Sequence, residues 1–403
     1  MATHNHNHNP APRTGRTTPN RALIVGAAAL FTDMLVHGLA VPVLPMLPAV
    51  VEQGPAATGF LFASYAIAMI IATFFAGRMV DRYGPKAPLL IGLVGLASAT
   101  LLFATGGPYW LLLVARFAQG IAGGTSWVAA LSLIAATTPF EKRGQAMGIA
   151  MSTITLGVLI GPPLAGFMVE RLGAASPFLL AAGVALADGA LRIVLVKDSP
   201  RVGDDTAGPI AVLRVPGSLS IVLAIVVGAG VLSGIEPVLP VHLGGGALTI
   251  GLLFGLASFA AIIANPLVGR CISTASPRLL IGSGVLAAAA SLLVLGWAGE
   301  LWQTCIGMSL LGISSALLLA PATALIGEQG SRSNPPTIGG SFALYNFAYA
   351  AGLAAGPLLT GYSVQQAGFT TAMLITAIAL AVVGGVGLIR LPDQRQASGQ
   401  ATD

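Results

Sequence analysis

Residues 59–78 read GFLFASYAIAMIIATFFAGR, and residues 251–270 read GLLFGLASFAAIIANPLVGR. Each stretch holds about twenty mostly apolar residues, the number that an α-helix needs to cross a hydrocarbon core roughly 30 Å thick. Both stretches end in Gly-Arg, where a helix would reach water. The two copies lie 192 residues apart. The sequence therefore predicts a membrane protein that contains a repeated unit.

The composition of the whole chain agrees with a membrane location. Of its 403 residues, 55% are hydrophobic and only 8% are charged. Soluble domains carry about 25% charged residues, so this chain has too few to cover a surface that faces water. The lipid bilayer is therefore an expected partner of most of the chain.

Apolar stretches of spanning length recur along the chain and predict twelve transmembrane helices. A polar segment rich in Pro, Gly and Asp, residues 198–215, divides them into two groups of six. The predicted fold class is an all-α membrane protein with two pseudo-symmetric six-helix bundles. We place the helices at residues 22–47, 59–80, 87–105, 109–134, 145–170, 175–197, 216–242, 247–269, 278–298, 301–327, 338–362 and 368–391.

These helices imply five segments along the chain. The sequence predicts a disordered cytoplasmic tail, an N-terminal bundle, a cytoplasmic linker, a C-terminal bundle and a second cytoplasmic tail. Their predicted bounds are 1–20, 21–197, 198–215, 216–391 and 392–403.

The Lys and Arg residues predict the orientation in the membrane. Cytoplasmic loops of membrane proteins carry an excess of these residues. With a cytoplasmic N-terminus, 17 of the 19 lie in cytoplasmic segments or helix ends. Both termini are then cytoplasmic, and the net charge of +5 needs no nucleic-acid partner to explain it.

Further repeats extend the duplication over both halves. VPVLP at 41–45 matches EPVLP at 236–240, and GVLIGPPLAG at 157–166 matches GLAAGPLLTG at 352–361, each 195 residues apart. A unit with an even number of helices keeps both copies in one orientation. Parallel repeats of this kind place a binding site at their interface, near the middle of the membrane.

Three ionisable residues inside apolar helices are the main candidates for that site. An ionised carboxylate at the centre of the bilayer costs about 2.5–3.5 kcal/mol, so Asp33 is expected to face the bundle interior. Glu236 is the second candidate and lies beside Pro237 and Pro240, which interrupt the helical hydrogen bonds there. Burial favours the neutral form of a carboxyl group, which suits loading and release of a proton. His37 lies one turn after Asp33 on the same helix face and could relay that proton.

The loop after the second helix reads GRMVDRYGPK, residues 77–86, and resembles a signature of the major facilitator superfamily. The resemblance implies the two-bundle transporter fold. It also implies that this gating motif pairs with neighbouring helix ends when the cytoplasmic side is closed. The residues concerned are Gly77, Asp81, Arg82, Gly84 and Lys86.

Two more motifs narrow the resemblance to drug:proton antiporters. RFAQG at 116–120 is similar to a fourth-helix motif, which implies that Arg116 helps to organise proton coupling. GVLIGPPLAG resembles the fifth-helix motif of proton-coupled exporters, and its close-packing residues are Gly157, Gly161, Pro162 and Gly166. Within this group the chain looks most like vesicular amine transporters and their bacterial relatives.

The chain departs from the animal vesicular transporters at several positions. Tyr65 stands where they have a second-helix lysine, and Asn346 stands where they have an eleventh-helix aspartate. No carboxylate lies between Leu301 and Gly327, where they have another. We therefore expect a thinner acidic network and a bacterial plasma-membrane exporter, with Tyr65 and Asn346 included among the site residues.

The predicted function is proton-coupled export of amphiphilic, cationic small molecules by alternating access. A tetracycline-type exporter and a proton-coupled uptake symporter of a small metabolite are the alternatives. No metal cluster or catalytic triad supports an enzyme, so we expect no cofactor and no metal. The expected partners are a small-molecule substrate and protons, and the expected state is a monomer.

Overall fold

The computed structural model describes residues 18–138, 140–196, 208–272 and 275–389. All regular elements among these residues are helices. Eleven of them are long and apolar enough to cross a membrane. The two predicted tails and residues 198–207 of the predicted linker lie almost wholly outside the described residues, so the predicted segment bounds stay a prediction.

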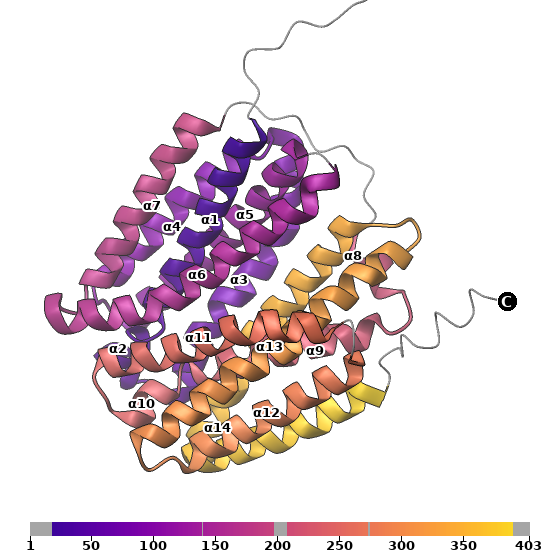
Figure 1. The fold of residues 1–403 in the computed structure, drawn as a ribbon. Helices are drawn as coiled ribbons and strands as arrows, with labels where there is room; N and C mark the ends of the chain where they lie inside the picture. Colours follow the sequence, from indigo (N-terminus) through magenta and orange to yellow (C-terminus); the bar gives the residue numbers. More distant parts are fainter. Residues whose placement is uncertain (1–17, 139, 197–207, 273–274, 390–403) are drawn as a thin grey trace, which may run out of the picture.

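The first half of the chain forms one bundle of helices that pack against one another (Figure 1). Most of them begin or end within a few residues of the predicted bounds. The elements are α1 (Pro19–Ala40), η1 (Leu44–Met46), α2 (Pro48–Val51), α3 (Gly54–Tyr83), α4 (Lys86–Ala104), α5 (Tyr109–Thr137), α6 (Phe140–Leu172) and α7 (Ser176–Leu195).

The second half forms a similar bundle. It begins with a short helix in the part of the predicted linker that the structure describes. The elements are α8 (Pro209–Leu213), α9 (Ser218–Ile235), α10 (Leu239–Leu243), α11 (Ala247–Cys271), α12 (Pro277–Trp297), α13 (Leu301–Arg332) and α14 (Ile338–Ile389).

The count of eleven differs from the predicted twelve because α14 contains two crossings. It has 52 residues, which at 1.5 Å per residue is far longer than a bilayer core of about 30 Å. Gly368 has φ 76°, a left-handed conformation inside this element. The chain reverses there, so residues 338–367 and 369–389 correspond to the two predicted helices.

Both halves interrupt a helix at the repeated Val/Glu-Pro-Val-Leu-Pro sequence. Helix α1 ends at Ala40, and α9 ends at Ile235, directly before Glu236. Proline lacks an N–H group and cannot continue the helical hydrogen bonds. The predicted helices 22–47 and 216–242 are therefore each a long helix followed by short helical turns, η1 and α10.

We call the side that carries the connections after η1 and α10 the distal face, and the side with the α3–α4 and α11–α12 connections the terminal face. The two bundles lie against each other near the distal face, and their helices diverge toward the terminal face (Figure 1). Contacts between the bundles concentrate in two seams, α3 with α14 and α6 with α11, together with η1 against α10.

Candidate functional site

Asp33 is buried inside the first bundle, on the middle part of α1. Its side chain is 2% exposed. The hydroxyl of Tyr65, on α3, donates a hydrogen bond of 3.2 Å to Asp33 Oδ2. Asp33 Oδ1 has no hydrogen-bond partner among the described residues. One carboxylate oxygen is thus held, and the other remains available for a proton.

Arg116, on α5, lies fully buried beside this pair. Its Nη1 donates to Gln119 Oε1 at 2.6 Å, and its guanidinium carbon lies 4.8 Å from the centre of the Tyr65 ring and 5.2 Å from that of Phe62. Arginine stays charged in proteins, and aromatic faces stabilise a cation at such distances. The site therefore contains a permanent positive charge.

His37 joins this cluster to the second bundle. Its Nδ1 lies 3.3 Å from Arg116 Nη2, and its Nε2 lies 3.8 Å from Oε2 of Glu236, directly after α9. Because arginine only donates hydrogen bonds, Nδ1 must be the acceptor. A neutral His37 then carries its proton on Nε2, which faces Glu236. The imidazole is the contact between the buried arginine of one bundle and the carboxylate of the other.

The charges of the cluster do not cancel when its acids are ionised. Asp33 and Glu236 together carry two negative charges, and Arg116 carries one positive charge. Leaving one net negative charge in a buried site is costly. A proton or a cationic ligand would remove this cost, so the cluster can attract either one.

Two further residues of α5 shape the site and were not predicted from the sequence. Gln119 holds Arg116, and Gly123 leaves room for Asp33, since a Cβ there would lie 2.6 Å from Asp33 Oδ1. Both follow Arg116 at helical spacing, on its face of the helix. That periodicity is the signal in the sequence that could have identified them.

Asn346 does not join the cluster. It lies half-buried on α14, and among the described residues its side chain makes no hydrogen bond to Asp33, His37, Arg116 or Glu236. The structure thus brings together five of the six residues predicted for coupling and substrate. No group of three or more potential metal ligands occurs in the described part of the chain.

The motif on α6 packs on both bundles. Gly157 and Gly161 contact α1, where Gly161 lies against the backbone of Gly38. Pro162 lies against Gly38 as well and also contacts α11 of the second bundle at Gly251, and Gly166 contacts α11 at Ala247. The motif is therefore a packing surface between α1 and the opposite bundle, outside the charged cluster.

The predicted gating motif spans the end of α3 and the start of α4. Gly84 has φ 75° and its N–H bonds to the carbonyl of Val80, which closes α3. Arg82 is exposed, and its guanidinium lies over the ring of Tyr83. Lys86 is the first residue of α4. Gly77 has open space around it, since a Cβ at this position would have no neighbour within 4 Å. The side chain of Asp81 lies outside the described part, so its pairing stays a prediction.

A second buried pair of charges lies elsewhere in the first bundle. Asp188 and Arg192, one turn apart on α7, form an ion pair and are 6% and 1% exposed. Arg192 Nη1 also donates to the carbonyl of Leu89 on α4 and to Ser126 Oγ on α5. The two charges neutralise each other, and the contacts with α4 and α5 make the pair a structural junction.

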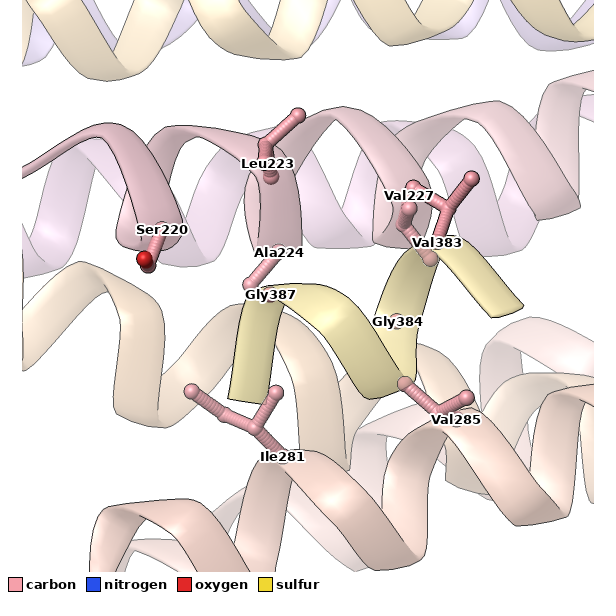
Figure 2. Close-up of a pocket in the computed structure, with 9 residues that line it drawn as sticks. All are labelled: Ser220, Leu223, Ala224, Val227, Ile281, Val285, Val383, Gly384 and Gly387. Carbon is pink, nitrogen blue, oxygen red and sulfur yellow. The ribbon is translucent and has the colours of Figure 1, made fainter. Parts of the chain in front are cut away.

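One apolar pocket lies away from the charged cluster, between α9, α12 and the end of α14. Figure 2 shows Leu223 and Val227 of α9, Ile281 and Val285 of α12 and the glycines of α14 around it. Ser220 supplies its one polar side chain. A lining without charge gives no means to select an ion, so we do not assign substrate binding to it.

Comparisons with known proteins agree with this architecture. The sequence profile of the Major Facilitator Superfamily matches residues 26–245 and 217–403. A crystal structure of a bacterial homolog to the human lysosomal transporter Spinster, in an inward-facing and unoccupied conformation, superimposes with a TM-score of 0.76. That alignment covers 92% of this chain and 96% of the other, at 13% identity. The similarity in structure shows a common fold.

Relatives of known identity include three vesicular transporters. The chromaffin granule amine transporter of Rattus norvegicus is 30% identical over 348 residues, which is 85% of this chain and 66% of that protein. The synaptic vesicular amine transporter of Mus musculus is 27% identical over 79% of this chain and 63% of that protein. The vesicular acetylcholine transporter of Drosophila melanogaster is 28% identical over 80% of this chain and 58% of that protein.

In each case the alignment spans two thirds of the relative or less. The match to the family profile nevertheless covers almost all of the described helices. Two bundles related by internal repeats, a buried charged cluster between them and this profile match lead to one conclusion. The chain is a multi-pass membrane transporter and belongs to the Major Facilitator Superfamily.

Proposed function

We propose that this transporter exports amphiphilic amines or other lipophilic cations in exchange for protons. The observation that carries the proposal is the buried cluster with two carboxyl groups and one arginine. Its excess negative charge can be neutralised by a cationic substrate or by protons, but the two compete for it. Competition for one buried charge is the physical basis of antiport. The amine transporters among the relatives support the choice of a cation.

The two carboxyl groups belong to different bundles, which suits alternating access. Asp33 belongs to the first bundle and Glu236 to the second. Protonation on the side that holds more protons would release the cation there, and deprotonation on the other side would restore the binding state. We propose a bacterial plasma membrane, with the terminal face toward the cytoplasm, where the excess of Lys and Arg would lie.

The energy of a proton gradient is sufficient for this exchange. One proton that moves down one pH unit and about 100 mV releases roughly 1.4 plus 2.3 kcal/mol. Export of a monovalent cation against the same voltage takes back about 2.3 kcal/mol. One proton therefore supports a substrate gradient of about tenfold, and two protons support roughly several thousandfold.

The test is uphill transport by the purified protein in liposomes with an imposed pH gradient. Tetraphenylphosphonium, ethidium, an aromatic monoamine and tetracycline are suitable probes. We expect the cations to move against the proton flow, and the steady-state gradient to report the proton number. Movement of a substrate together with protons would instead identify uptake by symport, and transport of tetracycline alone would identify the tetracycline-type exporter.

His37 gives a separate prediction at this site. His37→Ala removes the contact between Arg116 and Glu236, and a hydrogen bond to a charged group contributes a factor of about ten or more. We expect the rate of gradient-driven transport to fall about tenfold. His242→Ala is the matched control, because His242 stacks on Phe369 at the distal end. Equal rates in both variants would exclude a role for His37 in coupling.

A further inference from the structure

Two side chains cap helix starts across the boundary between the bundles. Glu170, at the distal end of α6, accepts a hydrogen bond of 3.2 Å from the backbone N–H of Leu248, in the first turn of α11. Gln365 lies at the distal end of residues 338–367, the first of the two helices in α14. It accepts a hydrogen bond of 3.0 Å from the backbone N–H of Ala56, in the first turn of α3. The first N–H groups of a helix have no partner within it, so each side chain satisfies one of them.

The two caps occupy equivalent places in the repeat. Glu170 and Gln365 lie 195 residues apart, and Ala56 and Leu248 lie 192 residues apart. These are the offsets that relate the repeated sequences of the two halves. The same contact thus occurs once in each seam, with the roles of the two bundles exchanged.

The helix backbones beneath the caps are packed by glycines in the same symmetric way. A Cβ on Gly59 would overlap the carbonyl oxygen of Pro357, and a Cβ on Gly251 would overlap that of Pro162. These pairs also obey the two offsets. Each seam therefore consists of a glycine contact with a capping side chain one to two turns further toward the distal face.

A cavity of about 220 Å³ lies between the two bundles at this face. Thr58 of α3 and Pro237, which follows Glu236, both line it. The cavity therefore lies between the charged cluster and the distal face. Opening of the seams that flank it would connect the cluster to that side.

We propose that Glu170 and Gln365 form a two-part latch that closes the distal side of the transporter. The latch rests on alternating access as part of the proposed function, but not on the identity of the substrate or on proton coupling. Each cap holds the first turn of a helix in the opposite bundle, so separation of the bundles must break both. Glu170 adds a negative charge near the positive helix end, which strengthens its cap relative to the neutral Gln365.

The experiment measures how often the distal side opens. Thr58→Cys introduces a thiol that is buried in the closed state, since Thr58 is 1% exposed. Cys271 and Cys305 are replaced by Ser, and a membrane-impermeant maleimide is added to the purified protein in detergent. The labelling rate then follows the fraction of molecules in which the distal seams are open, even when this fraction is small.

Loss of one helix cap changes such an equilibrium about fivefold. We expect Glu170→Ala and Gln365→Ala each to raise the labelling rate about fivefold, and the double variant to raise it about twenty-five-fold. Glu170→Gln keeps the acceptor oxygen but not the charge, so it should have a smaller effect than Glu170→Ala. Both side chains are exposed, so these variants remain folded.

Glu300→Ala is the matched control. Glu300 also caps a distal helix, but α13 belongs to the same bundle. We expect its labelling rate to equal that of the parent protein. An unchanged rate in the double variant would overturn the latch, and so would an equal rise in Glu300→Ala. Because the assay contains no substrate and no gradient, failure of the antiport proposal would leave this result unaffected.

Discussion

Asp33→Asn is expected to abolish gradient-driven transport while leaving the fold intact. Asparagine has nearly the same volume, and its side-chain oxygen can still accept the hydrogen bond from Tyr65. It cannot bind or release a proton, however. Loss of a positioned proton-transfer group lowers rates by about a hundredfold or more. Uphill uptake of a labelled cation into liposomes measures this directly.

The substitution also changes the charge balance of the site. With an asparagine in place of the acid, Glu236 and Arg116 neutralise each other, and a cation gains less by entering. We therefore expect weaker substrate binding together with the loss of coupling, which equilibrium binding of the same cation would report. Glu236→Gln should be measured beside it. Uphill transport at the parent rate in Asp33→Asn, with loss only in Glu236→Gln, would assign the coupling to Glu236 alone.

Much of the fold could be predicted because hydrophobicity and repetition determine it. Helix positions followed from the length of apolar stretches, and the pairing of the halves followed from their repeated sequences. The interruption after Ala40 was not placed correctly, because Pro42 and Pro45 stand within an otherwise uniform apolar stretch. Pro237 indicates a local interruption beside Glu236, because the effect of a proline on a helix can be read from the sequence, but the predicted helix 216–242 still ran across the break.

The site was partly predictable for a different reason. Ionisable groups in apolar helices are expensive, so Asp33, Arg116 and Glu236 stand out in the sequence. Gln119 and Gly123 do not, because neither an uncharged amide nor a glycine carries the cost of an ionisable group in a membrane helix. The position of His37 between the bundles depends on how two helices from different halves approach each other. Tertiary packing determines this, and spacing along one helix does not reveal it.

Removal of Asp188 is expected to destabilise the protein strongly. Asp188→Ala leaves the guanidinium of Arg192 buried between α4, α5 and α7 without its counter-ion. Loss of one partner of a buried ion pair costs roughly 3–5 kcal/mol. Unfolding of the protein in mixed micelles, followed by circular dichroism, measures the change in the free energy of unfolding. We expect Asp188→Ala to lower the free energy of unfolding, while the transport rate per folded molecule should change little.

Two comparisons separate this explanation from a general sensitivity of the helices. Glu328→Ala breaks an ion pair with Arg332 of the same one-turn spacing on α13, but both side chains are exposed there. Exposed pairs contribute about 0–1 kcal/mol, so this variant should remain close to the parent. Replacement of both buried partners, Asp188→Leu with Arg192→Met, removes the charges together and should recover most of the loss. The double variant could instead be as unstable as Asp188→Ala. The instability would then come from disturbed contacts of Arg192 with Leu89 and Ser126, and the explanation by an uncompensated buried charge would be wrong.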